Sequence, residues 1–279
     1  MTDQYAVMGN PVAHSKSPFI HAAFARQTGQ QLEYKTLLVE PGCFVSSVDE
    51  FFAQGGKGLN ITVPFKQEAW ELARRKSPDA TLAGAVNTLL LDQRGTLHGH
   101  NTDGVGLVRD ILQNNGGILV GKAILILGAG GATRGIVLPL LKERPNRICI
   151  ANRTVEKAMQ LADIFDHQGE IEACGYPDLS GQVFDWVINA SSASLQGELP
   201  PLPAGIITDK SWCYDLMYAA EPTIFCRWAQ QQGATSLDGL GMLVEQAAEA
   251  FWLWRKVRPK TASVLEDLRV KMRQQASNR

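Results

Sequence analysis

The 279-residue sequence lacks the features that mark membrane proteins, secreted proteins and nucleic-acid binders. No run of about 18 apolar residues is present, and the first residues, Met-Thr-Asp-Gln-Tyr, do not combine the basic and apolar regions of a signal peptide. Lysine and arginine together number 27 against 28 aspartates and glutamates, so no basic excess would attract nucleic acid. We therefore expect neither a membrane segment nor a nucleic-acid partner.

Paired cysteines and clustered metal ligands are absent as well. The five cysteines show no paired spacing: Cys43, Cys149, Cys174, Cys213 and Cys226. His98 and His100 are two residues apart with no cysteine or carboxylate beside them, so we expect no metal site. Unpaired thiols are typical of a reducing compartment, which predicts a cytoplasmic protein.

A glycine-rich turn is the most informative feature that is present. The apolar residues 124–127 are followed by Gly128-Ala129-Gly130-Gly131-Ala132 and then by a helical pattern. Glycines at such a turn let backbone N–H groups at a helix N-terminus approach a pyrophosphate. The third position of the general fingerprint holds Thr133 instead of Gly or Ala, and an ordinary tight turn is the alternative. The strand–turn–helix context favours dinucleotide binding.

The end of the next apolar run indicates which dinucleotide is bound. Residues 147–151 are followed by Asn152-Arg153-Thr154, at the place where an NAD site usually carries a carboxylate for the ribose hydroxyl. Hydrogen-bond donors and a cation suit the 2′-phosphate of NADP instead. A solvated surface arginine is the alternative for Arg153. The sequence therefore predicts an NADP-dependent dehydrogenase.

Apolar periodicity and chain length predict an α/β protein of two domains. In the first part we expect a largely parallel sheet with strands at 5–8, 34–39 and 58–63, a hairpin of 85–91 with 96–99, and helices at 18–28, 43–54 and 65–75. The second part has a Rossmann-like order, with strands at 123–127, 147–151, 170–174, 184–189, 206–208 and 212–216 and helices at 104–114, 132–142 and 154–166. An amphipathic helix from Leu240 that ends before Pro259, and a helix at 261–274, follow.

Two pairs of polar residues lie where a purely structural chain would favour other side chains. Ser15 and Ser17 lie on a turn that leads into a helix N-terminus, where hydroxyl and N–H groups can bind a carboxylate. The alternative is that they are turn residues, with Ser17 as the helix cap. Asn60 and Thr62 share one face of a short strand whose residues 59, 61 and 63 face the core. They could instead form the hydrated side of an edge strand.

Four further polar residues have both a functional and a structural interpretation. Lys66 is in the first turn of a helix, where the helix dipole disfavours a cation, although a solvated lysine would cost little. Asn87 lies in the apolar segment 85–89, where Asn is a poor strand former. Asp103 begins a helix and could be its cap, and Gln246 borders the apolar face of the helix after Leu240.

Seven motifs together resemble shikimate dehydrogenase, in particular the NADP-dependent biosynthetic form from bacteria. In chain order they are Asn10-Pro-Val-Ala-His-Ser-Lys-Ser-Pro18, Asn60-Ile-Thr-Val-Pro-Phe-Lys66, Gly84-Ala-Val-Asn-Thr88, Asn101-Thr-Asp-Gly104, Gly128-Ala-Gly-Gly-Ala132, Asn152-Arg-Thr154 and Asp238-Gly-Leu-Gly-Met-Leu-Val-Glu-Gln246. They span about residues 5–255 in the order of the family.

The resemblance implies a reaction, a domain organisation and a set of site residues. The family reduces 3-dehydroshikimate to shikimate with NADPH on the route to chorismate and aromatic amino acids. It implies a substrate domain at 1–101 and an NADP-binding domain at 102–239, followed by C-terminal helices at 240–279 that pack back on the substrate domain. The active site is expected in a cleft where the hydride donor and the hydride acceptor can meet. The implied substrate-binding residues are Ser15, Ser17, Asn60, Thr62, Lys66, Asn87, Asp103, Tyr218 and Gln246. The implied nucleotide-binding residues are Gly128, Ala129, Gly130, Gly131, Ala132, Asn152, Arg153, Thr154, Lys157, Leu216, Gly239 and Met242.

Lys66 and Asp103 are the implied catalytic residues. Burial would favour a neutral amine at Lys66 and a nearby carboxylate would favour the ammonium, and the sequence leaves this choice open. A quinate/shikimate dehydrogenase that uses NAD as readily as NADP, and a non-catalytic nucleotide-binding regulator of the same fold, are the alternatives. A folate-linked dehydrogenase lacks support in the substrate motifs, and a homodimer is an assembly that the sequence leaves open.

Overall fold

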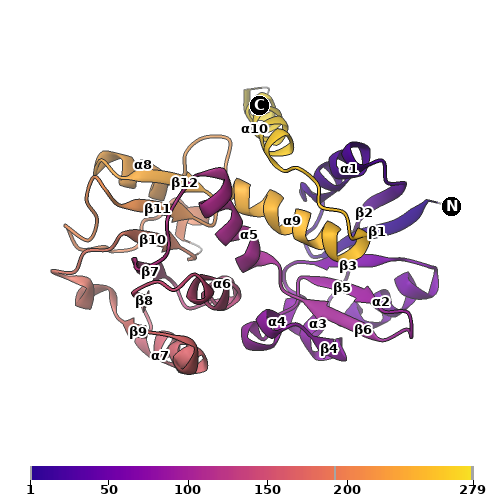
Figure 1. Cartoon of the computed structure of the whole chain (residues 1–279), viewed down its shortest axis with the longest axis horizontal. Helices are drawn as coiled ribbons and strands as arrows, with labels where there is room; N and C mark the ends of the chain where they lie inside the picture. Colours follow the sequence, from indigo (N-terminus) through magenta and orange to yellow (C-terminus); the bar gives the residue numbers. More distant parts are fainter. Residues whose placement is uncertain (1, 192, 278–279) are drawn as a thin grey trace. The chain divides into compact units, whose positions relative to one another are not determined.

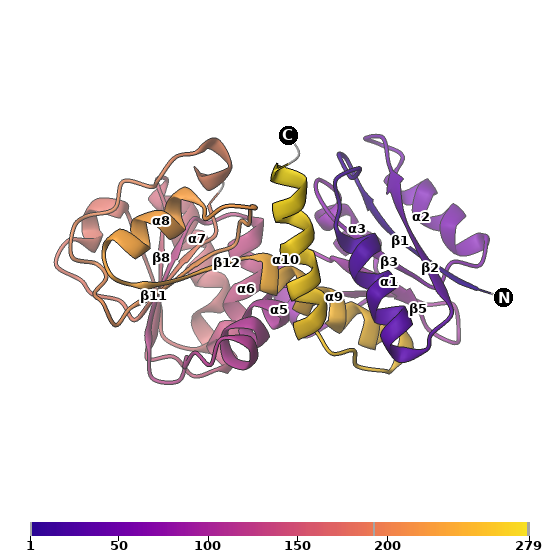
Figure 2. The ribbon, with the colours of Figure 1, turned by 90° about the horizontal axis from the view of Figure 1, so that it is seen from above.

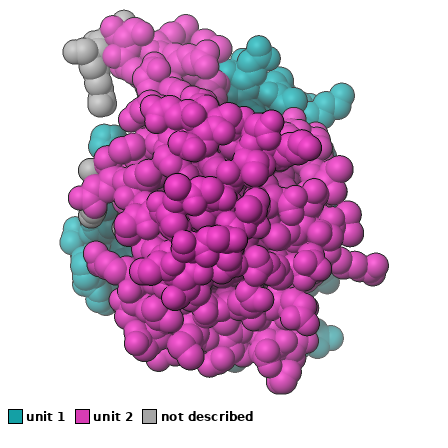
Figure 3. Space-filling view, turned by 90° about the vertical axis from the view of Figure 1, so that its left-hand side faces the viewer, with its two compact units in different colours: residues 1–106, 244–268 teal, residues 107–243, 269–279 magenta. Residues whose placement is uncertain are grey.

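The chain divides into two compact units. The structure, a computed structural model, describes residues 2–191 and 193–277. Unit 1 comprises residues 1–106 and 244–268, and unit 2 comprises residues 107–243 and 269–279 (Figure 3). Three helices have residues in both units: α5 (Asp103–Arg109), α9 (Leu240–Arg255) and α10 (Ala262–Ser277). None of the described helices has the length and apolar character that a membrane span requires.

Unit 1 is built on a mixed six-stranded sheet with the order β2-β1-β3-β5-β6-β4 (Figure 1). Apart from the three helices that have residues in both units, its elements are β1 (Asp3–Gly9), α1 (Ser17–Thr28), β2 (Leu32–Leu38), α2 (Phe44–Ala53), β3 (Gly58–Ile61), α3 (Lys66–Leu72), β4 (Arg75–Lys76), α4 (Pro78–Ala83), β5 (Thr88–Leu91) and β6 (Leu97–His100). Strand β1 is parallel to β2 and β3, whereas β5 is antiparallel to β3 and β6. The prediction of a hairpin is confirmed. The sheet that contains it is parallel in three of its five strand pairs, because β4 is also parallel to β6, so the prediction of a largely parallel sheet holds outside the hairpin strand β5.

Several predicted boundaries in unit 1 are wrong. The helix predicted at 65–75 ends at Leu72, and the strand predicted at 85–91 begins at Thr88. Between them lie β4 and α4, which the apolar periodicity does not predict. Helix α4 nevertheless has local signals: the Ser77 hydroxyl accepts a hydrogen bond from the N–H of Ala80, and Gly84 has the left-handed conformation at the C-terminal end.

Strand β3 places its alternating residues on two buried faces. Leu59 and Ile61 contribute to the apolar core with Met8 and Phe65, as predicted. Val63 does not, since β3 ends at Ile61 and the Val63 side chain is 60% exposed. Because β3 lies between β1 and β5, Asn60 is buried on the opposite face and does not lie on a hydrated sheet edge.

A cluster of aromatic rings covers this second face of the sheet. Helix α1 packs on β2 (Figure 2). It carries His21, whose ring stacks on Tyr34 with the ring centroids 4.2 Å apart. Phe251 and Trp254 of α9 lie 6.2 and 5.4 Å from the same ring. Burial lowers the pKa of His21 to about 3, and a weaker contact with Asn60 acts in the opposite direction. His21 is therefore a neutral member of the apolar core near physiological pH.

The buried state of His21 predicts an acid-sensitive fold. The unfolded chain binds a proton at this residue below its ordinary pKa of 6.5, while the folded chain does so only near a pKa of about 3. Stability therefore falls as the pH decreases through this window, by about 2 kcal/mol between pH 6 and pH 4 from this residue alone. Urea unfolding at several pH values measures the slope, and His21→Phe is the control because it keeps a ring but cannot titrate. An unchanged slope in His21→Phe would contradict the prediction.

Unit 2 is a six-stranded parallel sheet with the order β12-β11-β10-β7-β8-β9. Its own elements are β7 (Ala123–Leu127), α6 (Gly131–Lys142), β8 (Arg147–Ala151), α7 (Val155–Phe165), β9 (Ile171–Cys174), β10 (Trp186–Asn189), β11 (Trp212–Asp215), α8 (Ile224–Gln231) and β12 (Thr235–Asp238). Read from β9, this is the strand order of the doubly wound dinucleotide-binding fold, which confirms the Rossmann-like prediction. The inner strands β7, β8, β10 and β11 are buried along nearly their whole length, as expected where helices cover both faces of such a sheet.

Three predictions for unit 2 differ from the structure. The segment 206–208 is not a strand, although Ile206 and Ile207 are buried in the core of the unit. Helix α8 and strand β12 were not expected. The end of the helix predicted at 104–114 is a π-helical turn over Asp110–Asn114. A buried apolar residue thus marks the core but does not by itself identify a strand.

Candidate active site

Lys66 and Asp103 form an ion pair in unit 1. Lys66 is the first residue of α3 and Asp103 is the first residue of α5. The Lys66 Nζ atom donates to Asp103 Oδ2 over 2.6 Å, and the two side chains are 31% and 17% exposed. The carboxylate offsets the unfavourable position of a cation at a helix N-terminus. The pair is accessible enough to meet a small ligand and sheltered enough for its charges to interact strongly.

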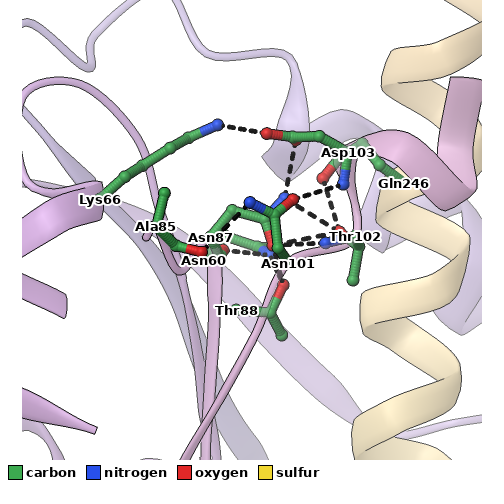
Figure 4. Close-up of polar contacts among 9 residues, drawn as sticks. All are labelled: Asn60, Lys66, Ala85, Asn87, Thr88, Asn101, Thr102, Asp103 and Gln246. Atoms are coloured by element: carbon green, nitrogen blue, oxygen red, sulfur yellow. Dashed lines mark hydrogen bonds and ion pairs between the residues drawn. The ribbon is translucent and has the colours of Figure 1, made fainter. Parts of the chain in front are cut away.

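Asn87 holds the other oxygen of the same carboxylate. It lies just before β5, and its Nδ2 atom donates to Asp103 Oδ1 over 2.7 Å (Figure 4). Its Oδ1 atom accepts hydrogen bonds from the Thr88 hydroxyl (2.9 Å) and the Thr102 N–H (3.0 Å). A buried Asn in this apolar segment is therefore explained by its hydrogen bonds to Asp103, Thr88 and Thr102.

Asn60 lies one strand away from Asn87 in the same polar cluster. Its Nδ2 atom donates to the Asn87 carbonyl (3.2 Å) and the Thr88 hydroxyl (3.1 Å). Its Oδ1 atom accepts from the Tyr34 hydroxyl over 2.7 Å. Thr62 follows β3, is half-buried, and donates its N–H to the Met8 carbonyl. Its side chain lies against Gly9 at the end of β1, where a Cβ atom would be 2.3 Å from the Thr62 methyl group.

The two serines lie at the start of α1, but the predicted cap is wrong. The N-cap is Lys16, whose carbonyl accepts from the Ile20 N–H and whose side chain does not cap the helix, and Ser17 is the first residue of the helix. The turn closed by the Ser15 N–H and the Val12 carbonyl brings the Ser15 hydroxyl to accept from the Ser17 N–H over 3.3 Å. Ser15 is half-buried and Ser17 is buried.

Gln246 and Tyr218 belong to different units. Gln246 of α9 is in unit 1, where its Oε1 atom accepts from the Thr102 hydroxyl over 3.3 Å (Figure 4). Tyr218 follows β11 in unit 2 and is half-buried, and burial raises its pKa. The structure therefore joins Gln246 to the cluster around Asp103, whereas Tyr218 lies in the segment after β11 of unit 2.

The glycine-rich turn in unit 2 has the form that the motif predicts. Gly128 follows β7 with φ of 103°, a conformation that side chains rarely adopt, and a Cβ atom there would lie 3.2 Å from the Ser191 nitrogen. Helix α6 begins at Gly131, and Gly131 and Ala132 are exposed. Their N–H groups lack helical partners because they are in the first turn, so this end of α6 fits a pyrophosphate.

Thr133 accounts for the departure from the general fingerprint. Its side chain is buried, and its hydroxyl donates to the Gly128 carbonyl over 2.7 Å. The hydrogen bond ties the first turn of α6 to the start of the loop. A threonine therefore closes the turn by a polar contact at a position where the general motif has Gly or Ala.

The residues predicted for the adenosine phosphate lie at the end of the neighbouring strand. Strands β7 and β8 are paired in parallel, so both end at the same edge of the sheet. The Asn152 side chain donates to the Thr154 carbonyl over 2.8 Å, which shapes the turn into α7. Arg153, Thr154 and Lys157 are exposed there. Two cations and a hydroxyl are thus available to a phosphate at this edge.

Leu216 directly follows β11, Gly239 directly follows β12, and Met242 lies in the first turn of α9. A Cβ atom on Gly239 would lie 2.1 Å from the Leu216 carbonyl oxygen, so the two strand ends approach each other only because residue 239 is glycine. The Met242 N–H donates to the Tyr214 hydroxyl over 3.2 Å, and that hydroxyl donates to Asp110 over 2.7 Å. These contacts hold the backbone around the three predicted residues.

Three residues of the polar cluster were missed by sequence reasoning. Thr88 and Thr102 are adjacent to Asn87 and Asp103 within motifs already recognised, so their positions carried a signal. Tyr34 carried none, because an aromatic residue in an amphipathic strand is an ordinary core residue. For metal binding, residues 2–191 and 193–277 contain no group of three or more His, Cys, Asp or Glu side chains that could hold an ion.

Comparisons with known proteins agree along the chain. The family models that match are the shikimate dehydrogenase substrate binding domain (residues 7–89), shikimate / quinate 5-dehydrogenase (residues 110–196) and the shikimate 5′-dehydrogenase C-terminal domain (residues 239–269). A shikimate dehydrogenase (NADP(+)) of Nitrosococcus oceani is 57% identical over 273 residues, which are 98% of this chain and 97% of that protein.

Two solved structures extend the agreement to three dimensions. The crystal structure of an Ael1 enzyme from Pseudomonas putida has a TM-score of 0.91 and 48% identity, and the match covers 96% of this chain and 98% of that one. Shikimate 5-dehydrogenase from Thermus thermophilus, in complex with NADP(H) and shikimate, has a TM-score of 0.85 and 31% identity, with 95% of this chain and 98% of that one covered.

Proposed function

The chain belongs to the shikimate dehydrogenase family, and we propose that it reduces 3-dehydroshikimate to shikimate with NADPH, reversibly, in the biosynthesis of chorismate and aromatic amino acids. The observation that carries the proposal is the ion pair of Lys66 and Asp103 within a cluster of buried amides. A non-catalytic regulator of the same fold would have no need to keep a partly exposed ammonium and carboxylate in such a cluster.

NADPH supplies a hydride for the ketone carbon when it is bound. The glycine-rich turn and the start of α6, from Gly128 to Ala132, would hold its pyrophosphate, and Asn152, Arg153, Thr154 and Lys157 would hold the 2′-phosphate. Leu216, Gly239 and Met242 would border the nicotinamide, at a place where contacts within the unit hold their backbone. The exposed N–H groups of α6 and the exposed cations after β8 support this assignment.

Lys66 acts on the oxygen of the reacting carbonyl. Its ammonium donates a hydrogen bond that stabilises the alkoxide as negative charge develops, and then transfers a proton to it. Asp103 accepts from Lys66 and keeps the ammonium oriented, while Asn87 fixes Asp103. In shikimate oxidation the same amine takes the hydroxyl proton.

The remaining polar side chains bind the substrate. Ser15, Ser17 and Thr62 hold its carboxylate with their hydroxyl groups, and the amides of Asn60, Asn87 and Gln246 and the phenol of Tyr218 contact its hydroxyls. Residues 1–101 are thus the substrate domain, residues 102–239 the NADP-binding domain, and residues 240–279 the helices that return to the substrate domain. A cytoplasmic location fits the five free cysteines, and a homodimer is a further prediction that sedimentation analysis can test.

Steady-state oxidation of shikimate and of quinate, each with NADP and with NAD, tests the proposed function. We expect the highest kcat/KM for shikimate with NADP, since the end of β8 offers cations and donors to a 2′-phosphate. Equal or greater kcat/KM with quinate or with NAD would support the quinate/shikimate alternative. Absence of reduced nicotinamide with every combination would support the regulator.

A further inference from the structure

Two buried residues outside the proposed ligand contacts, Tyr34 and Thr88, are linked to the catalytic pair. The Tyr34 hydroxyl donates to Asn60 Oδ1 over 2.7 Å. Asn60 Nδ2 donates to the Thr88 hydroxyl over 3.1 Å, and the Thr88 hydroxyl donates to Asn87 Oδ1 over 2.9 Å. The series continues from Asn87 Nδ2 to Asp103 Oδ1. Every donor in it points away from Tyr34 and toward Asp103.

The donor-to-acceptor direction in the first half of the series is determined by the Asn87 carbonyl, which can only accept a hydrogen bond, and by the protonated Tyr34 phenol. The Asn87 carbonyl can only accept, so the end of the Asn60 amide that lies 3.2 Å from it must be Nδ2. The other end is then Oδ1, which requires a donor and finds the Tyr34 hydroxyl. Burial raises the pKa of the Tyr34 phenol far above its ordinary value, and a side-chain hydrogen bond from Ser17 acts in the opposite direction. The phenol therefore stays protonated and donates to Asn60.

The second half is determined in the same way. The Thr102 N–H can only donate, so the Asn87 atom that lies 3.0 Å from it must be Oδ1. Because Thr88 already accepts from Asn60, its proton is directed to the same Oδ1 atom. Both groups leave Nδ2 of Asn87 facing Asp103, where it donates over 2.7 Å. A reversed Asn87 amide would instead set its oxygen against a carboxylate oxygen.

Burial raises the free-energy cost of breaking these hydrogen bonds. Tyr34, Asn60, Asn87 and Thr88 are each less than 9% exposed, so water cannot easily replace a lost partner. Polar networks in such an interior are also cooperative, so that the loss of one donor weakens its neighbours. A small displacement of Asp103 changes the position of the Lys66 ammonium, to which catalysis is sensitive.

We propose that Tyr34 and Thr88 are positioning residues, which set the Asn87 amide and through it hold Asp103 and Lys66 in the reactive arrangement. The inference rests on the proposed dehydrogenase function. It adds two residues that touch neither substrate nor cofactor, and it assigns their effect to the orientation of an amide and not to packing alone.

Thr88→Val tests the inference, with Thr88→Ser as the matched control. Valine keeps the shape of threonine without its hydroxyl, and we expect kcat for shikimate oxidation to fall by about tenfold, with the KM for NADP unchanged. We also expect the pH profile of kcat to change, because the Lys66 ammonium takes a different position relative to Asp103. Serine restores the hydroxyl but loses a methyl group, so it should recover most of kcat while remaining less stable than the parent.

The outcomes separate packing from positioning. If kcat instead follows stability, with the serine variant as impaired as the valine variant, the positioning role is overturned. Tyr34→Phe is a second test that keeps the ring stacked on His21, and it should reproduce the loss of kcat and the altered pH profile to a smaller extent. It decides the question if Thr88→Val does not fold. A parent protein that is inactive with shikimate and NADP overturns the proposed function, whereas an active parent with variants of equal kcat and pH profile overturns only this inference.

Discussion

Replacing Lys66 by alanine is expected to lower kcat for shikimate oxidation by at least about 10²-fold, the usual contribution of general acid–base catalysis. The substitution removes the ammonium that donates to Asp103 and that, in the proposed mechanism, donates to the reacting oxygen, and alanine offers no other proton carrier. The KM for NADP should change little, because none of the residues that are predicted to bind the nucleotide lies on α3. Steady-state kinetics with each substrate varied in turn measure both quantities.

Lys57→Ala is the matched control for this prediction. Lys57 is an exposed lysine of the same unit, directly before β3, and its removal changes the net charge equally. The control should retain parental kcat. A Lys66→Ala protein with near-parental turnover would exclude Lys66 from the mechanism, while loss of activity in both variants would indicate a general effect of charge.

Replacing Arg153 by alanine is expected to lower kcat/KM for NADP by about 10- to 100-fold, the scale of one or two hydrogen bonds to a charged group. Arg153 is exposed at the end of β8, where the resemblance places the 2′-phosphate. NAD lacks this phosphate, so kcat/KM for NAD should remain near the parental value. The measurement is kcat/KM for both nucleotides at a fixed, saturating concentration of shikimate.

This experiment needs a control and a second variant. The control is Arg273→Ala, and the second variant combines Arg153→Ala with Lys157→Ala. Arg273 is an exposed arginine of unit 2 in α10, and its loss should leave both nucleotides unaffected. Lys157 lies in the first turn of α7 as a second exposed cation, so the double variant should lose more activity with NADP than the single one. An equal decrease for NADP and NAD would show that Arg153 supports the turn and does not recognise the phosphate.

The parts of the fold that were predicted correctly depend on short-range physical constraints. The strand, glycine turn and helix at 123–142 lie close together in sequence, and Gly128 needs a conformation with positive φ that marks such a turn. The apolar runs of β7, β8 and β10 identify a parallel sheet because they are buried on both faces. Lys66 and Asp103 could also be recognised as candidates from local features. Lys66 begins a helix, where the helix dipole disfavours a cation, and Asp103 begins a helix, where a carboxylate is one of several possible caps.

The errors arose where local pattern and tertiary contact compete. Ser17 follows the cap rule for a helix N-terminus, yet the preceding turn makes Lys16 the cap and leaves Ser15 to accept from Ser17. The apolar pair Ile206 and Ile207 contributes to the core without pairing as a strand. Asn60 was as compatible with a hydrated edge as with a buried site, because alternation along a strand does not indicate what covers each face.

The amino-acid sequence by itself determined the classes of the two parts, the nucleotide-binding turn, and which charged and amide side chains were candidates for chemistry. These follow from periodicity, glycine conformation and helix-end electrostatics, which act over a few residues. Only the tertiary structure decided that Lys66 and Asp103 meet at 2.6 Å, and that Tyr34 and Thr88 lie behind Asn87 in one directed series. These contacts join residues from different strands and helices, and their partners are chosen by strand order and burial, which no local pattern contains.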